Sequence, residues 1–163
     1  MKKWWCALLA AVLLTGCGGQ KDLATVGDSY IVPQVPAASR IWLELPEDAT
    51  MLTMESDTEG TLYLCRDYTV TVQTLTGGDL DSTLRKVTGF GKEELTVYSY
   101  RQNGLTRHAC VWAAAGEGTD QVGKAVILDD GIYHYAVAVL VPSEQAGEQE
   151  ESIRQLLDSV QLE

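Results

Sequence analysis

The chain has 163 residues, of which 45% are hydrophobic and 21% charged, and its formal net charge at pH 7 is -11. This composition is that of one ordinary globular domain, and it excludes a collagen-like fibre, a coiled coil and a disordered tail. The acidic balance excludes nucleic acid as a partner, because such binding depends on basic side chains that neutralise phosphates. A protein with several membrane spans is also excluded, since only one stretch is apolar enough to enter a bilayer.

The N-terminal residues 1–16 predict a secretory signal peptide. Lys2 and Lys3 form a positively charged start, and an apolar stretch over residues 4–14 follows. This stretch is shorter than the about 20 residues that a membrane-spanning helix needs, but it has the length of the apolar part of a signal peptide. It ends in Leu14-Thr15-Gly16-Cys17, which resembles the lipobox of bacterial lipoproteins.

The lipobox resemblance implies that the chain is cut before Cys17 and that this thiol then carries acyl chains such as palmitate. We expect the lipid to hold the protein at the extracytoplasmic face of the cell membrane, because an acidic surface does not bind anionic lipids. Residues 17–40 then form the lipidated cysteine and a flexible tether, since they contain Pro33 and Pro36 and show no sustained hydrophobic period. The alternatives are an ordinary signal peptide that ends in a chance cysteine and a short apolar N-terminal helix.

Residues 41–163 predict a single α+β domain. Apolar and polar residues alternate with period two over 41–45 and 68–75, which is typical of half-buried strands. Further strands are predicted over 50–54, 61–66, 95–100, 105–114, 124–128 and 132–141. Asn103-Gly104 and Asp129-Asp130-Gly131 each indicate a hairpin turn. Residues 116–123 are polar and rich in glycine, and they predict a loop.

Two helices are also predicted. The first follows residues 77–79, ends at Gly89, and has three apolar residues at helical spacing: Leu80, Leu84 and Val87. The second is a long amphipathic helix at the C-terminus that Ser143 caps, with Glu150 and Arg154 paired on its polar side. Its apolar face consists of Ile153, Leu156, Leu157 and Val160.

The order of these elements predicts an antiparallel sheet of about six or seven strands flanked by helices. It resembles the PsbP/Mog1-like family of α/β/α sandwich domains over nearly all of residues 41–163. The resemblance depends on residues 42–46 in the opening strand, residues 129–135 before the last strand, and the helix over 152–162. A cystatin- or NTF2-like cone is the competing fold, but its helix usually precedes most of the strands.

Cys65 and Cys110 both lie in predicted strands. Export permits a disulfide between them, which the chain-entropy model values at about 4 kcal/mol, and the alternative is two separate cysteines in the core. The spacing leaves both alternatives open. His108 shares a strand face with Cys110, and His134 with Cys65 would complete a set of nitrogen and sulfur ligands, but the close ligand pairs of structural zinc sites do not occur. We therefore predict no metal and no cofactor.

Five aromatic residues form a candidate binding face. Tyr98 and Tyr100 share one strand face, Tyr133 and Tyr135 share another, and Trp112 lies in a strand between them. If helices leave such a face uncovered, it offers an adhesive platform for a peptide or a glycan, and otherwise these residues belong to the core and its rim.

The sequence contains none of the common catalytic motifs, so we expect no enzymatic activity. It predicts a membrane-anchored, extracytoplasmic lipoprotein that serves as a non-catalytic protein-interaction or accessory module of the cell envelope, with another envelope protein as its partner. Two alternatives remain open, namely a lipoprotein that binds a small molecule or a glycan, and an enzyme of a kind that these motifs do not reveal.

Overall fold

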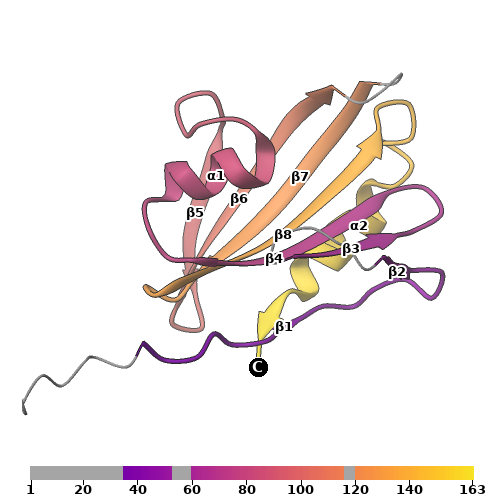
Figure 1. The fold of residues 1–163 in the computed structure, drawn as a ribbon. Helices are drawn as coiled ribbons and strands as arrows, with labels where there is room; N and C mark the ends of the chain where they lie inside the picture. The colour runs from indigo at the N-terminus through magenta and orange to yellow at the C-terminus, as the bar shows by residue number, and fades with distance from the viewer. Residues whose placement is uncertain (1–34, 53–59, 116–119) are drawn as a thin grey trace, which may run out of the picture. The chain divides into compact units, whose positions relative to one another are not determined.

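The computed structural model describes residues 35–52, 60–115 and 120–163 (Figure 1). A compact unit runs from Ala37 to Glu163. Its elements are β1 (Ile41–Trp42), β2 (Thr50–Leu52), β3 (Gly60–Leu64), β4 (Thr69–Thr76), α1 (Leu80–Thr88), β5 (Val97–Gln102), β6 (Leu105–Ala115), β7 (Asp120–Asp129), β8 (Tyr133–Pro142), α2 (Glu150–Ser159) and β9 (Gln161–Leu162).

The signal peptide, the lipobox with Cys17 and residues 18–34 of the expected tether lie outside the described residues. Within the part of the chain that the structure describes, no helix is long and apolar enough to cross a membrane.

Seven strands form one sheet in the order β2-β3-β4-β8-β7-β6-β5, and every neighbouring pair is antiparallel. This confirms the predicted sheet. Asn103 and Gly104, with φ of 51° and 83°, join β5 to β6. Two successive residues with positive φ make a turn whose twist matches that of the strands, which explains why the Asn-Gly pair marks this hairpin.

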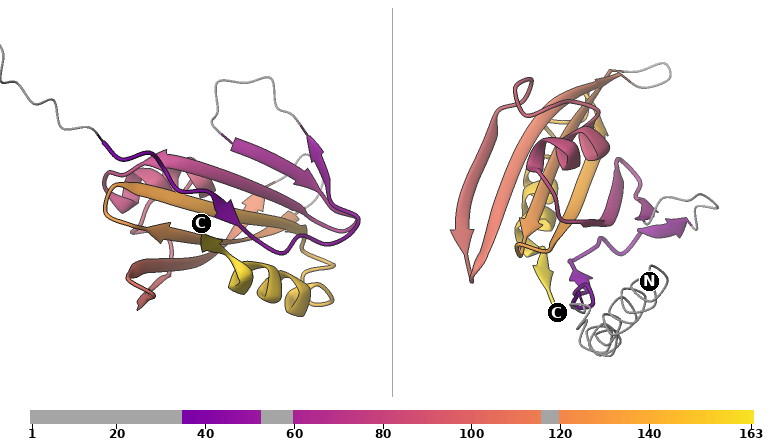
Figure 2. Two further views of the ribbon diagram at one scale, coloured as in Figure 1. Left: turned by 90° about the horizontal axis from the view of Figure 1, so that it is seen from below. Right: turned by 60° about the vertical axis from the view of Figure 1, so that its left-hand side comes forward.

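The sheet carries a helix on each face (Figure 2). Because side chains alternate along β8, the residues Val137, Val139 and Val141 pack on the α2 side, while Ala136 and Ala138 face the α1 side. On the α2 side the core includes Ile153, Leu156, Leu157 and Val160 of the C-terminal segment, and on the α1 side it includes Leu84. The predicted apolar stripes of both helices are therefore the faces that they bury.

Helix α1 begins and ends at the predicted residues. The Asp79 carboxylate caps its start by accepting hydrogen bonds from the Ser82 N–H at 3.1 Å and the Ser82 hydroxyl at 2.7 Å. Gly89 ends it with φ of 84° and donates its N–H to the carbonyl of Arg85. A residue with a Cβ atom rarely adopts this left-handed conformation, which accounts for the glycine.

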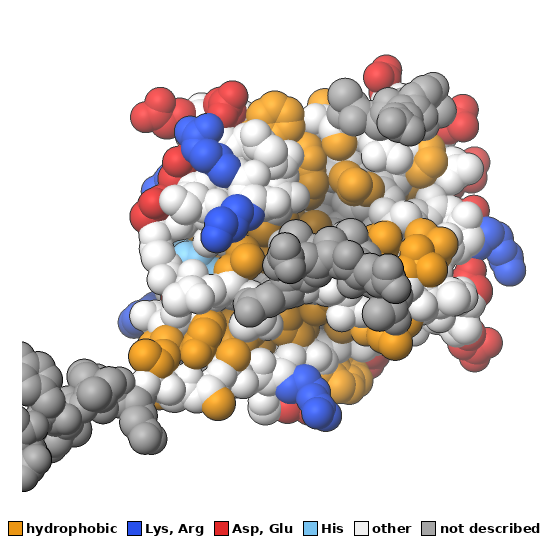
Figure 3. Space-filling model, viewed as in Figure 1, with side chains coloured by type: hydrophobic (Ala, Val, Ile, Leu, Met, Phe, Trp, Pro, Cys, Tyr) orange, Lys and Arg blue, Asp and Glu red, His pale blue; other side chains and the backbone are white. Residues whose placement is uncertain are grey.

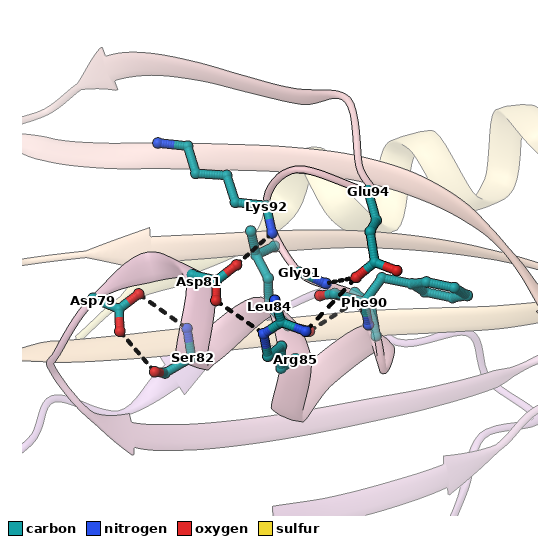
Figure 4. A network of polar contacts seen from close by, with 10 residues as sticks. Asp79, Asp81, Ser82, Leu84, Arg85, Phe90, Gly91, Lys92 and Glu94 are labelled. Atoms are coloured by element: carbon teal, nitrogen blue, oxygen red, sulfur yellow. Dashed lines mark hydrogen bonds and ion pairs between the residues drawn. The ribbon is translucent and has the colours of Figure 1, made fainter.

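A polar network holds the connection between α1 and β5 (Figure 4). The Asp81 carboxylate accepts hydrogen bonds from the Lys92 N–H at 2.6 Å and from Arg85 Nε at 2.9 Å. These two donors hold the pKa of Asp81 below its ordinary value. Glu94 accepts the Gly91 N–H at 2.8 Å, and its Oε2 lies 3.7 Å from Arg85 Nη1. The network therefore ties the loop that leads into β5 to the surface of α1.

Helix α2 differs from the prediction at both ends. Ser143 does not cap it, because the helix begins only at Glu150 and Gln149 is its N-cap residue. The Ser143 N–H instead bonds to the carbonyl of Asp120 and extends the sheet pairing. It ends at Ser159, since Gln161 and Leu162 pair with β1 instead of continuing the helix. The expected pair of Glu150 and Arg154 does not form.

Both residues form ion pairs with other partners. Arg154 Nη2 lies 2.6 Å from Oε1 of Glu151, and its Nη1 lies 3.3 Å from Oδ2 of Asp158. Glu150 faces Lys124 of β7, with 3.6 Å between Oε1 and Nζ. One side of α2 is therefore joined to the sheet through an ion pair, while Arg154 stays with the exposed carboxylates of its own helix.

Strand β7 begins earlier than expected, because residues 120–123 belong to the strand and not to the loop predicted over 116–123. Gly123 pairs with Trp112 of β6 and with Leu140 of β8. The Trp112 ring lies directly over Gly123, so that a Cβ atom at this position would approach the ring to 2.1 Å. Gly123, which indicated a loop in the sequence, thus leaves the space in which the ring of the buried Trp112 packs.

The domain also extends further towards the N-terminus than expected. Arg40 and Glu163 exchange two backbone hydrogen bonds, next to the pairing of β1 with β9. The Ser39 N–H donates to the hydroxyl of Tyr135 at 3.0 Å. Residues 37–40, which we expected to lie in the tether, are therefore part of the compact unit.

We predict that Gly123→Ala lowers the free energy of unfolding by about 1–3 kcal/mol, because the added methyl group overlaps the Trp112 ring in a well-packed core. Chemical denaturation of the full-length chain in detergent measures this. Gly78→Ala is the matched control, since a Cβ at Gly78 meets nothing within 4 Å, and it should change the stability by less than about 0.5 kcal/mol. Equal effects of the two substitutions would contradict the packing of Trp112 on Gly123.

Candidate functional site

Helix α2 leaves part of its side of the sheet uncovered at β5 and β6. Tyr98 and Tyr100 of β5 pair with Ala109 and Arg107 of β6, and Ala109 packs against the α2-side core. The two tyrosines therefore face the same side as α2, where they remain 69% and 48% exposed. Val111, the next residue on this face of β6, is 55% exposed. We call Tyr98, Tyr100 and Val111 the open β5–β6 face.

A groove of about 210 Å³ lies between this open face and α2. Its apolar walls include Ala109, Val126 and Leu157, and its charged rim contains both signs, with Lys124 and Arg154 near Glu150 and Asp158. The buried Arg107 also lines the groove. An apolar surface surrounded by polar and charged groups is typical of protein-interaction surfaces.

The open face lies beside a free sheet edge. Strand β5 is the last strand of the sheet, and within the described residues it pairs only with β6. Half of the backbone N–H and C=O groups of such a strand point away from the sheet, where a further extended segment can pair with them. The face and the edge together can thus bind an extended polypeptide, through both backbone and side chains.

The five predicted aromatic residues do not form one binding face, which corrects the prediction. Trp112 is buried on the α1 side, and Tyr135 is fully buried on the α2 side. The Tyr135 hydroxyl donates to Oδ2 of Asp130 at 2.9 Å, and its ring centroid lies 6.1 Å from that of Tyr133. Because covering by helices decides which aromatic residues stay exposed, only Tyr98 and Tyr100 of this set form part of the site.

The structure adds residues that the sequence analysis did not single out. Arg107 and Val111 lie on the strand predicted over 105–114, and their alternation with His108 and Cys110 places them on the opposite face. Nothing in the sequence indicates that α2 stops short of this part of the sheet. The charged rim of the groove comes from the two elements β7 and α2, and only the fold brings them together.

A second polar cluster lies on the α1 side and contains both histidines of the chain. Nδ1 of His134 lies 2.6 Å from the Thr83 hydroxyl of α1, and Nδ1 of His108 lies 2.7 Å from the Ser99 hydroxyl of β5. The Nε2 atoms of His134 and His108 lie 3.7 and 3.9 Å from the two oxygens of Asp129. Figure 3, drawn from the α1 side, shows that little histidine surface is accessible there.

These imidazoles have hydrogen-bond partners, as expected for histidines inside a domain. Burial lowers the pKa of His108, although the nearby Asp129 carboxylate opposes this change. Both histidines are therefore held by hydroxyl groups at one nitrogen and face one carboxylate at the other. No group of three or more residues within 35–52, 60–115 and 120–163 is arranged to hold a metal ion.

Asp129 and Asp130 also shape the turn between β7 and β8. Asp129 Oδ1 accepts the Gly131 N–H at 2.7 Å, and Asp130 Oδ1 accepts the N–H groups of Ile132 and Tyr133 at 2.7 and 2.6 Å. The acidic pair thus has the turn chemistry that its sequence indicated.

The two cysteines are free thiols, so the disulfide alternative does not hold in this structure. Cys110 is buried in the α1-side cluster, whereas Cys65 packs against the α2-side core, and the sheet separates them. Burial raises the pKa of Cys110 to about 11, and burial together with Asp48 raises that of Cys65. A thiol with such a pKa stays protonated and unreactive at neutral pH.

Solved structures define the fold class of this domain. The solution structure of cyanobacterial PsbP (CyanoP) from Synechocystis sp. PCC 6803 superposes with a TM-score of 0.57 at 10% identity, over 80% of this chain and 96% of that one. LpqN, a protein involved in cell envelope biogenesis of Mycobacterium tuberculosis, superposes with a TM-score of 0.49 at 13% identity, over 80% of this chain and 87% of that one. The Ran-binding protein Mog1p of Saccharomyces cerevisiae has 0.48 at 12%, over 75% and 89%.

The superposition with the cyanobacterial protein confirms that the chain has a PsbP-like fold, as its element order predicted. At 10% identity this similarity concerns the fold alone. A scan of protein-family models and a search of curated protein sequences find no match.

We predict that the stability of the protein falls as the pH decreases from about 7 to about 5, because burial lowers the pKa of His108 in the folded state. The unfolded chain then binds a proton at His108 more readily than the folded chain does. Stability from this group is complete above its ordinary pKa of 6.5 and decreases as the pH falls through and below that value.

NMR titration of the His108 ring protons measures this directly, and denaturation at each pH measures its effect on stability. His108→Gln keeps a hydrogen-bonding partner for Ser99 and should flatten the pH dependence in this range. The Asp81 carboxylate does not contribute to the change in stability between pH 7 and pH 5, because the fold lowers its pKa below the ordinary value of 3.8. A folded-state pKa of His108 at or above 6.5 would contradict the prediction.

Proposed function

We propose that the chain is an exported lipoprotein, anchored through Cys17, and that its PsbP-like domain is a non-catalytic protein-interaction module of the cell envelope. The open β5–β6 face would be its contact surface. The observation that supports this most directly is the exposure of Tyr98, Tyr100 and Val111 side by side next to an unpaired sheet edge. Tyrosine is enriched among the residues that dominate the energy of protein interfaces.

The partner that fits this surface best is an extended segment of another envelope protein. An added strand would pair with the outer backbone groups of β5, and its alternate side chains would point towards the groove beside α2. Tyr98 and Tyr100 lie two residues apart on one face, which is the spacing of alternate side chains in such a strand. Small molecules are a poorer match, because both rings lie in the open and do not enclose a ligand.

The anchor is supported by the lipobox at residues 14–17 and by the acidity of the domain. Cleavage before Cys17 removes Lys2 and Lys3 but no carboxylate, so the mature chain is more acidic than the precursor. A surface of this charge is repelled by anionic lipids, and stable attachment would then depend on the acyl chains. The chain has 23 acidic and 12 basic residues.

We predict that Cys17→Ser abolishes labelling of the protein by an alkyne-tagged palmitate in bacterial cells and releases the protein from the membrane fraction. The matched control is Cys6→Ser, which removes a thiol that the signal peptidase would discard, and which should leave both labelling and fractionation unchanged. Persistent label on the Cys17→Ser protein would contradict the anchor.

We predict that a photo-reactive benzoylphenylalanine at position 98 cross-links the protein to a partner in intact cells, because this position is exposed on the open face. The control is the same residue at position 51 on β2, at the opposite edge of the sheet, where Met51 is 61% exposed. Peptide mapping of the adduct identifies the partner and the attached segment.

Binding of the purified partner is then measured for the native chain and two variants. Tyr100→Asp should weaken it by at least about 30-fold, as expected for a residue at the centre of an interface. Met51→Asp should leave it unchanged. Equal cross-linking from both positions, or equal effects of both substitutions, would contradict an interface on the open β5–β6 face.

A further inference from the structure

Arg107 of β6 is a buried cation at the C-terminal end of α2. Its side chain points to the α2 side of the sheet, and the residue is only 4% exposed. Nη1 donates a hydrogen bond to the carbonyl of Val160 at 3.1 Å, and Nη2 donates to the carbonyl of Leu157. These carbonyl groups lie at the C-terminal end of the helix, where the regular hydrogen bonds of the helix run out. The Leu157 carbonyl also accepts the Val160 N–H at 3.3 Å.

The charge of Arg107 is only partly compensated. The C-terminus of a helix carries roughly half a negative charge, and the guanidinium carries a full positive one. No carboxylate among the described residues forms an ion pair with Arg107, and Asp158, which lines the same hollow, pairs with Arg154 instead. A buried charge without a counter-ion is costly, so a bound anion at this place would recover free energy.

A hollow of about 250 Å³ borders Arg107 and has room for such an anion. It lies between the β5–β6 turn, the end of α2 and β9. Gln102 and Gln161 contribute amide groups to its lining, while Leu105 and Leu128 contribute apolar surface. The hollow thus combines one buried positive charge, neutral hydrogen-bond donors and an apolar wall.

We infer that this hollow binds a compact organic carboxylate, with its charged group on Arg107 and its carbon chain against Leu105 and Leu128. The fork of N–H donors on a guanidinium matches the two oxygens of a carboxylate. A singly charged group is favoured over phosphate, because the helix C-terminus and Asp158 border the same hollow and oppose a larger negative charge. The hollow shares Arg107 and Asp158 with the groove beside the open β5–β6 face, but this inference does not depend on the interaction proposed there.

Calorimetric titration of the full-length chain in mild detergent at low salt tests the inference. The probes are butyrate and valerate, with butyramide and valeramide as neutral ligands of the same shape, and inorganic phosphate as an anion of larger charge. We expect heat of binding with at least one carboxylate and none with the amides. Arg107→Gln should weaken carboxylate binding by at least about 30-fold, whereas Arg154→Gln, which removes an exposed guanidinium, should not.

A second variant keeps the test decisive if Arg107→Gln unfolds the protein by removing the contact with α2. Gln161→Glu places a carboxylate in the hollow and leaves Arg107 and its bonds to the helix in place. It should abolish carboxylate binding and should preserve or raise the melting temperature. Binding by this variant equal to that of the native chain, binding of the amides, tighter binding of phosphate, or no binding by the native chain would each overturn the inference.

Discussion

The central strand β8 is the element on which the rest of the domain depends. It is apolar over nearly its whole length and is buried on both faces, with β4 and β7 as its neighbours. Its side chains are larger on one face than on the other: α2 packs on the face that carries the valines, and α1 lies on the face that carries the alanines. A strand buried on both faces requires cover on both, and this places one helix on each side.

The covering is uneven, and the function that we propose follows from this unevenness. Helix α2 is short and lies over the centre of the sheet, where its apolar residues Ile153 and Leu156 meet the valines of β8. Strands β5 and β6 extend beyond it on one side and therefore expose Tyr98, Tyr100 and Val111. The contacts that hold α2 in place thus also define the border of the exposed surface.

Arg107 is a buried residue that lies between the open β5–β6 face and the C-terminal end of α2. It reaches from the sheet to the end of α2, whose last turn contains no basic residue of its own. Its side chain lines both the groove beside the open face and the hollow below the helix end. One buried cation thereby stabilises the helix terminus and separates two hollows of different character, one mainly apolar and one mainly polar.

The sequence by itself determined the order and type of the elements, apart from β9, whose residues it assigned to the C-terminal helix. Local signals include the alternation along 68–75, the helical spacing of Leu80, Leu84 and Val87, and the Asn103-Gly104 turn, because backbone geometry sets them within a few residues. Tertiary structure decided the rest. The sequence predicted a loop at Gly123, but this residue lies in a strand under the Trp112 ring. It predicted a helix cap at Ser143, but the N–H of this residue bonds to Asp120 and the helix begins later.

The same division holds for the candidate sites. Period two places Tyr98 with Tyr100 on one face and His108 with Cys110 on another, but it cannot show which face a helix covers. It also cannot show that Cys65 and Cys110 lie on opposite sides of the sheet, or that Arg107 meets the end of α2. Exposure, pairing and charge compensation depend on residues far apart in the chain, so only the packing of the helices on the sheet determines them.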